Sequence, residues 1–118
     1  MAEKLERALS IRQPYVELIL RGKKREEYKS RPTYIKGRVY LYAGRKPGDY
    51  DWAARKYGVM CQPDSLPVGR IVGSVELVGC KLQRDGEYAW LLARPRRYRT
   101  ALTPRNQPQP SFWKPRFR

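Results

Sequence analysis

Residues 21–31 carry the side chains best suited to bind a polyanion. Directly after a glycine that is expected to end a helix, basic residues surround the two carboxylates Glu26 and Glu27. Arginine offers phosphate a planar fork of donors, and lysine offers a point charge. A strand edge also uses charges of both signs against aggregation, so a purely structural role stays open. The candidate phosphate-binding residues here are Arg21, Lys23, Lys24, Arg25, Lys29 and Arg31.

Aromatic side chains lie among basic ones in the first half of the chain. Bases stack on exposed rings for about 1–3 kcal/mol each while neighbouring cations hold the phosphates. Packing in a core is the alternative for each ring. The aromatic candidates are Tyr28, Tyr34, Tyr40, Tyr42 and Trp52, and the basic residues near them in the sequence are Arg25, Arg38, Arg45 and Lys46.

Glu76 stands inside an apolar, strand-like run, between Val75 and Leu77. A carboxylate with such neighbours needs a partner, or its pKa rises. Lys24 or an arginine could be that partner, and a Lys–Glu pair in a cleft can act as a general acid and base. A structural ion pair at an exposed strand edge is the alternative.

The overall charge points to an anionic partner. The chain has 118 residues with 26 Lys+Arg against 11 Asp+Glu, a net charge of +15. Such a protein attracts nucleic acid, an acidic membrane surface or an acidic protein. Arginine outnumbers lysine, which favours nucleic acid.

The residues typical of metal sites, hydrolase triads and nucleotide-binding loops are absent from the sequence. The chain has no histidine, and its two cysteines, Cys61 and Cys80, form no CxxC pair, so we expect no metal site and no cofactor. Neither a GxSxG motif nor a Walker-type loop is present. With no signal-like or membrane-spanning apolar run, we expect a cytoplasmic protein with reduced cysteines and no membrane partner.

The elements that would position these residues are short. We expect strands over residues 8–11, 37–43, 68–82 and 87–93, and a further strand-like stretch over 24–31. One helix opens with Pro14 at its first position and stops at Gly22, with Glu17 and Arg21 on its outer side. A second helix covers residues 50–57, with Asp49 or Asp51 as its cap and Gly58 as its stop.

Glycines and a proline-rich stretch complete the outline. Gly73 and Gly79 predict bulges in the long strand. Residues 103–111 predict an extended loop, and Phe112 and Trp113 a last strand that closes a barrel. We therefore expect one domain over residues 1–118, of the α+β class and mainly β, forming a small barrel of five or six strands with two short helices.

Two motifs resemble the ASCH domain family of the PUA-like superfamily. The first consists of Ser10, Ile11, Gln13 and Pro14 before a short helix. The second places Gly22, Lys24 and Glu27 as in a Gly-x-Lys-x-x-Glu-x-Arg motif, with Lys29 in the place of the arginine and Arg31 two residues on. The stretches GRVYLYA, EYAWLLARPRR and QPSFWKP resemble later strands of the family, in the same order.

The resemblance implies a barrel with a cleft beside its helices, and RNA binding as the main role. Some relatives are hydrolases of acylated pyrimidine nucleosides, or ribonucleases, in which a Lys, a Thr and a Glu act together. Lys24 would match the Lys and Glu76 the Glu, but Glu27 stands where the Thr nucleophile would be. Lys24 and Glu27 can share a site only if Lys24 lies on the turn after Gly22.

We therefore expect a monomeric RNA-binding domain, with DNA as a possible ligand. Gln13 and Glu27 would read base edges by hydrogen bonds. Two alternatives stay open. One is an enzyme with Lys24 and Glu76 as acid–base partners and Glu27 as helper, and the other is a module that docks an acidic protein. The expected phosphate and base contacts are Lys24, Arg25, Lys29, Arg31, Arg38, Tyr40 and Arg45.

Overall fold

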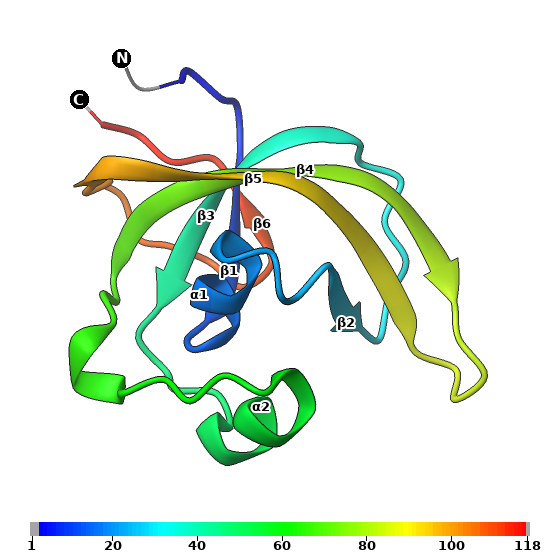
Figure 1. The fold of residues 1–118 in the computed structure, drawn as a ribbon. Helices are drawn as coiled ribbons and strands as arrows, with labels where there is room; N and C mark the ends of the chain where they lie inside the picture. Colours follow the sequence, from blue (N-terminus) through cyan, green and yellow to red (C-terminus); the bar gives the residue numbers. More distant parts are fainter. Residues whose placement is uncertain (1–2, 118) are drawn as a thin grey trace.

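The computed structural model describes residues 3–117, in which six strands form one curved sheet (Figure 1). The sheet order is β2-β5-β4-β3-β1-β6, and β1 and β3 are parallel while the other neighbours are antiparallel. The strands are β1 (Ala8–Arg12), β2 (Glu26–Lys29), β3 (Gly37–Gly44), β4 (Arg70–Leu82), β5 (Tyr88–Leu102) and β6 (Phe112–Trp113). The helices are α1 (Tyr15–Leu20) and α2 (Tyr50–Tyr57), with a 3-10 turn at Pro63–Ser65.

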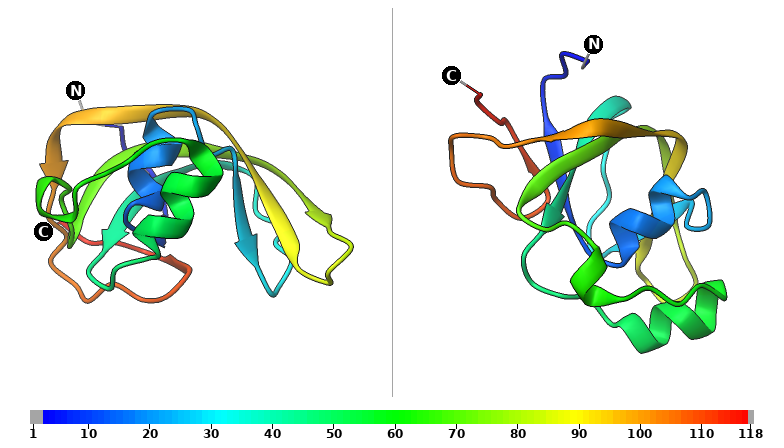
Figure 2. Two further views of the ribbon diagram at one scale, coloured as in Figure 1. Left: turned by 60° about the horizontal axis from the view of Figure 1, so that its bottom comes forward. Right: turned by 60° about the vertical axis from the view of Figure 1, so that its left-hand side comes forward.

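The sheet curls into a half-barrel whose hollow side holds α1, and α2 lies beyond it (Figure 2). The prediction of a mainly β, α+β barrel with two short helices is confirmed. Within residues 3–117 no helix is long and apolar enough to cross a membrane.

Strand β3 is buried on both of its faces. Val39 and Leu41 belong to the main core with Val16 and Ile19 of α1 and neighbouring strands. Tyr40, on the other face, joins a second apolar cluster that includes Ile71 and Trp113. The alternation of β3 is thus as expected, but neither face is left to solvent.

Strand β5 is longer than predicted, running to Leu102 and not ending at Ala93. A bulge makes this possible, because Glu76 pairs with Ala93 while Ser74 pairs with Arg96. Arg94 adopts φ 50° at this point. The strand can therefore pass Pro95 without a ladder hydrogen bond from the proline nitrogen. The predicted irregularities at Gly73 and Gly79 coincide with register shifts in the β4–β5 pairing.

The predicted last strand exists but does not close the barrel through its backbone. Strand β6 pairs with β1 at one edge of the sheet, and β2 forms the other edge. Side chains bridge the interior instead, since the rings of Trp90 and Phe112 stack with centroids 5.3 Å apart.

Both helices lie close to their predicted places. Helix α2 has the predicted bounds, with Asp49 accepting a hydrogen bond from the Trp52 amide and Gly58 ending it at φ 70°. Helix α1 begins at Tyr15, so that Pro14 is its cap and not its first residue. The expectation of an exposed Glu17 is wrong, because its side chain is 8% exposed and pairs with Arg97 of β5 as well as Arg21.

Candidate nucleic-acid interface

A cleft of about 800 Å³ opens at the end of β1 and β3, between β2 and the loop of residues 103–111. Its volume lies in the range of small-ligand sites. Tyr15 and Tyr42 contribute aromatic surface, and Glu27 contributes a carboxylate. The cationic lining residues are Arg12, Lys29, Arg45, Lys46 and Arg105.

The loop of residues 103–111 forms one wall of the cleft and is fastened at both ends. The Ser10 side chain donates a hydrogen bond to the Gln109 carbonyl (2.7 Å), and the Ser10 amide donates to the Ser111 carbonyl (2.9 Å). The Asn106 side chain bonds the Lys114 carbonyl and the Arg116 amide at 2.9 and 2.7 Å. The predicted extended loop is therefore an ordered wall.

Lys24 lies behind the cleft floor, on the turn that precedes β2. Its side chain is 2% exposed, and its Nζ lies 3.2 Å from Oε1 of Glu27 and 3.4 Å from the Tyr57 hydroxyl. The other oxygen of Glu27 lies 3.8 Å from Nζ of Lys29. Lys24 thus lies on the turn after Gly22, as is needed for Lys24 and Glu27 to share a site. Glu27 links the buried lysine to the cleft.

Tyrosine rings enclose the Lys24 ammonium on its remaining sides. Its Nζ lies 5.5, 4.7 and 5.7 Å from the ring centroids of Tyr15, Tyr28 and Tyr57. Burial lowers the pKa of Lys24, although Glu27 opposes this effect. Burial also raises the pKa of Tyr57 to about 12, so that its phenol stays neutral. The expected exposed phosphate contact at Lys24 is thus a buried ion pair here.

Helix α2 adds a second ammonium and an indole to this group. Trp52 meets Tyr15 and Tyr57 edge to face, with centroids 6.1 and 6.0 Å apart. Lys56 lies over the rings of Trp52 and Tyr57 at 5.7 and 5.8 Å. Since Tyr15 also lines the cleft, α2 supports the aromatic side of the cleft from behind.

Three of the expected contacts lie inside the fold and not in the cleft. Gln13 is 1% exposed, donates to the Pro67 carbonyl and accepts from the Glu17 amide. The Arg38 side chain is 12% exposed and bonds Ser74 and the Arg94 carbonyl. Tyr40 is buried in the second apolar cluster. Their polar groups are used in the structure and none of the three lines the cleft, so the expectation that they contact nucleic acid there is wrong.

The remaining basic candidates divide between three hollows. Lys29 and Arg45 line the main cleft, and Lys29 also lines an adjoining pocket with Arg31 beside Trp90. Arg25 lines a separate pocket of about 300 Å³ next to Arg94. Of residues 21–31, the side of the main cleft therefore includes Lys29 with its neighbour Arg31, but not Arg25.

Glu76 is not brought to Lys24. Arg94 binds both its oxygens at 2.9 Å, and Arg38 lies 3.9 Å away. The hydrogen bond from Arg94 lowers the pKa of Glu76, which keeps the carboxylate ionised. The adjacent Val75 belongs to the main core and lines the 300 Å³ pocket that Lys24 and Arg25 also line, so Glu76 lies on the opposite face of β4. The expected Lys24–Glu76 acid–base pair is absent from the described residues, and the structural ion pair is the reading that fits.

Tyr15, Arg12 and Arg105 were not foreseen as parts of the site. Tyr15 and Arg12 flank the Gln-Pro motif, and Arg105 lies within residues 94–118, which contain no Asp or Glu. The absence of acids from that stretch was the available signal. Nothing local indicates that residues so far apart in the sequence share a cleft.

In a scan against protein families, the ASCH domain matches residues 9–100. The chain belongs to the ASCH domain family. The match includes the Lys24–Glu27 pair and nearly all of β5, but the loop wall of this ASCH domain and β6 follow after it. No curated protein matches the chain by sequence.

Proposed function

We propose that this ASCH domain binds single-stranded RNA in the cleft beside β2. The observation that carries the proposal is the composition of the lining, in which cationic side chains surround Tyr15 and the Glu27 carboxylate. Cations that hold a backbone beside a ring that stacks a base are the usual elements of single-strand recognition. ASCH domains are PUA-like and are generally proposed to bind RNA, in line with this assignment.

Exposed cations of the cleft would hold the phosphates. Arg12, Arg45, Lys46 and Arg105 are exposed and come from β1, the segment after β3 and the loop wall. Among the described residues, no ion pair involves any of these four. They therefore meet a phosphate without first giving up a carboxylate partner.

Glu27 would read the base. Its carboxylate accepts hydrogen bonds only, and the amino groups of adenine, cytosine and guanine are donors. Lys24 and Lys29 flank Glu27 at 3.2 and 3.8 Å and compensate its charge. Uracil offers a single N3–H between two carbonyl oxygens that repel a carboxylate, so a base that carries an amino group is preferred to it.

The test is binding of labelled single-stranded RNA, duplex RNA and DNA over a salt series. The double variant Arg45→Gln/Arg105→Gln removes two cleft cations, and Lys36→Gln/Arg84→Gln removes two exposed cations that do not line the cleft. Each lost phosphate contact lowers the slope of log K against log salt by about 0.7 for a single strand.

We expect the cleft variant to lower the slope by about 1.4 and the control to leave it nearly unchanged. Equal effects of the two double variants would contradict the cleft as the binding site. Equal, weak binding of all three nucleic acids would mean that the positive charge attracts polyanions in general. That result would favour the alternative in which the domain docks an acidic protein.

A further inference from the structure

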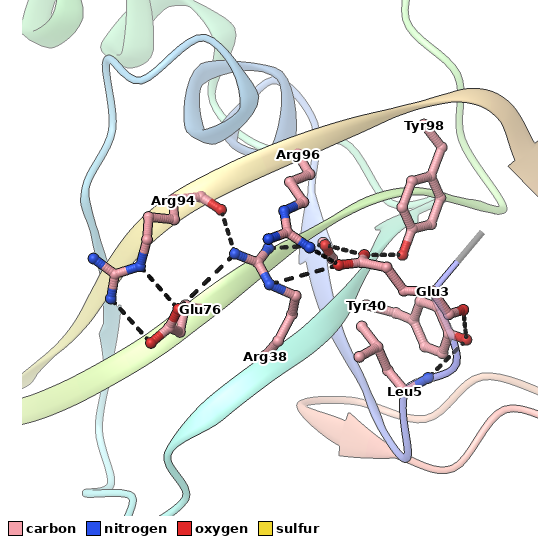
Figure 3. A network of polar contacts seen from close by, with 9 residues as sticks. Glu3, Leu5, Arg38, Tyr40, Glu76, Arg94, Arg96 and Tyr98 are labelled. Atoms are coloured by element: carbon pink, nitrogen blue, oxygen red, sulfur yellow. Dashed lines mark hydrogen bonds and ion pairs between the residues drawn. The ribbon is translucent and has the colours of Figure 1, made fainter. Parts of the chain in front are cut away.

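A second group of donors converges on one carboxylate, on the face of the sheet opposite α1 (Figure 3). The carboxylate is that of Glu3. It accepts from Ser74 Oγ at 2.5 Å and from the Tyr98 hydroxyl at 2.7 Å. Arg96 donates to its other oxygen, and Nε of Arg38 lies 3.6 Å from that oxygen.

Three of these donors, Arg38, Ser74 and Tyr98, are held in place by groups other than Glu3. Arg38 donates to Ser74 Oγ at 2.9 Å and to the Arg94 carbonyl at 2.8 Å. Ser74 is 0% exposed, and the ring of Tyr98 packs edge to face on Tyr40 with centroids 6.3 Å apart. Arg38, Ser74 and Tyr98 lie on three neighbouring strands of the sheet, so their arrangement does not depend on the carboxylate that they bind. The Arg96 side chain is 61% exposed, and among the described residues Glu3 is its ion-pair partner.

The cluster has an excess of positive charge. Arg38, Arg94 and Arg96 face the carboxylates of Glu76 and Glu3. If Glu3 leaves, only Glu76 remains against the three guanidinium groups. Two guanidinium groups and two hydroxyl groups pointing at one spot match the several acceptor oxygens of a phosphate.

The segment that carries Glu3 has few attachments. Residues 3–7 form neither helix nor strand. Besides the Glu3 carboxylate, the Glu3 carbonyl and Leu5 amide bond the Tyr40 hydroxyl, and the Arg7 carbonyl accepts from the Tyr40 amide. The Leu5 side chain packs against the second apolar cluster and holds the segment two residues after Glu3. The segment can therefore shift at Glu3 without disturbing any sheet pairing of the described strands.

We propose that this cluster is a second, oxyanion-binding site, occupied by the chain's own Glu3 carboxylate, which a phosphate group displaces. The ionisation of Glu3 agrees with this. Burial raises its pKa, but hydrogen bonds from Ser74, Tyr98 and Arg96 outweigh burial and leave the pKa lowered. The pKa of Tyr98 is raised, chiefly by burial, so that its hydroxyl remains a donor. The site lies apart from the cleft and does not depend on what the cleft binds.

The experiment compares Glu3→Ala with Glu6→Ala, titrated with pyrophosphate and with a short single-stranded oligoribonucleotide. Both variants lose one negative charge from the same segment, but Glu6 is 64% exposed and pairs only with Arg7 and Lys114 among the described residues. In the wild type, phosphate binds only the fraction of molecules in which the Glu3 carboxylate has left the site. Removing that carboxylate raises the apparent affinity for phosphate by the inverse of this fraction. We expect a rise of about tenfold or more for Glu3→Ala and none for Glu6→Ala. Glu3→Asp retains the charge with a shorter reach, and should show part of the rise.

A second substitution locates the effect. Adding Arg96→Gln to Glu3→Ala should abolish the rise, whereas adding Arg99→Gln, an exposed arginine on the same strand, should preserve most of it. A rise with both ligands identifies a site for free or terminal phosphate, and a rise with the oligonucleotide alone identifies a site for backbone phosphate. Equal responses of Glu3→Ala and Glu6→Ala, or no rise in either Glu3 variant while circular dichroism shows the native fold, would overturn the proposal.

Discussion

Replacing Glu27 by Gln tests the ion pair behind the cleft floor. The side chains of Lys24 and Glu27 are 2% and 12% exposed, with 3.2 Å between Nζ and Oε1. Removing one member of a buried pair costs about 3–5 kcal/mol, because the other charge is left uncompensated. The tyrosine rings contact Lys24 in wild type and variant alike, so their contribution cancels in the difference. We therefore expect Glu27→Gln to lose about 3–5 kcal/mol of unfolding free energy near neutral pH.

The loss should depend on pH in a definite direction. Burial holds the pKa of Lys24 below 10.5, and the negative charge of Glu27 partly raises it again. Because Glu27→Gln removes that charge, the substitution should lower the pKa of Lys24 further. Between the folded pKa and 10.5 the unfolded chain binds more protons, and stability rises with pH. The difference between wild type and variant should therefore be greatest near neutral pH and shrink toward 10.5.

Urea unfolding at several pH values under reducing conditions measures this difference. Glu26→Gln is the matched control, since Glu26 is 31% exposed and lies 3.8 Å from Lys81, itself 61% exposed. Such a pair contributes about 0–1 kcal/mol. A loss in Glu27→Gln that stays constant across this pH range would refute the account of Lys24 as a buried cation held by Glu27.

Two further substitutions test the cleft wall and the helix anchor. A Cβ at Gly48 would lie 2.4 Å from the Tyr15 ring, whereas at Gly44 it would meet only Ile11 O at 3.7 Å. Gly48→Ala should therefore weaken RNA binding by about 1–3 kcal/mol through displaced stacking, and Gly44→Ala should not, as filter binding can show. Glu17→Gln should cost about 2 kcal/mol at neutral pH by loss of the Arg97 and Arg21 bonds. Burial raises the pKa of Glu17, but these bonds outweigh it, so the cost should vanish in urea unfolding as pH falls from 4.5 through the lowered folded pKa.

The fold could be predicted where its determinants are local. Helix α2 carries its own cap at Asp49 and its own stop at Gly58, and its predicted bounds are those observed. Gly73 and Gly79 mark two of the register shifts of β4, because glycine is the residue that sequence alone associates with a bulge. The extension of β5 past Pro95 could not be predicted in the same way, since it depends on the pairing of Ser74 with Arg96 across the sheet.

The site was harder to predict because charge in a sequence does not reveal exposure. Arg38 and Tyr40 alternate with apolar residues on β3, a pattern typical of a strand with one solvent face. That face is covered by Leu5 and Trp113, which come from opposite ends of the chain. The sequence around Gln13 does not indicate that its side-chain nitrogen and oxygen both form hydrogen bonds inside the fold. The cleft wall likewise comes from residues 103–111, far from the motifs.

The positions of the carboxylates explain which cations are left to bind a ligand. Glu3, Glu17, Glu27 and Glu76 each pair with lysines or arginines that hold the sheet, α1 or the turn before β2. The surplus of the +15 charge must then lie on other, exposed side chains, such as those of the cleft and the loop wall. Only exposed cations release counterions when they meet phosphate. Salt dependence should therefore follow Arg45 and Arg105, whereas substitution of Lys24 or Arg38 should act first on stability.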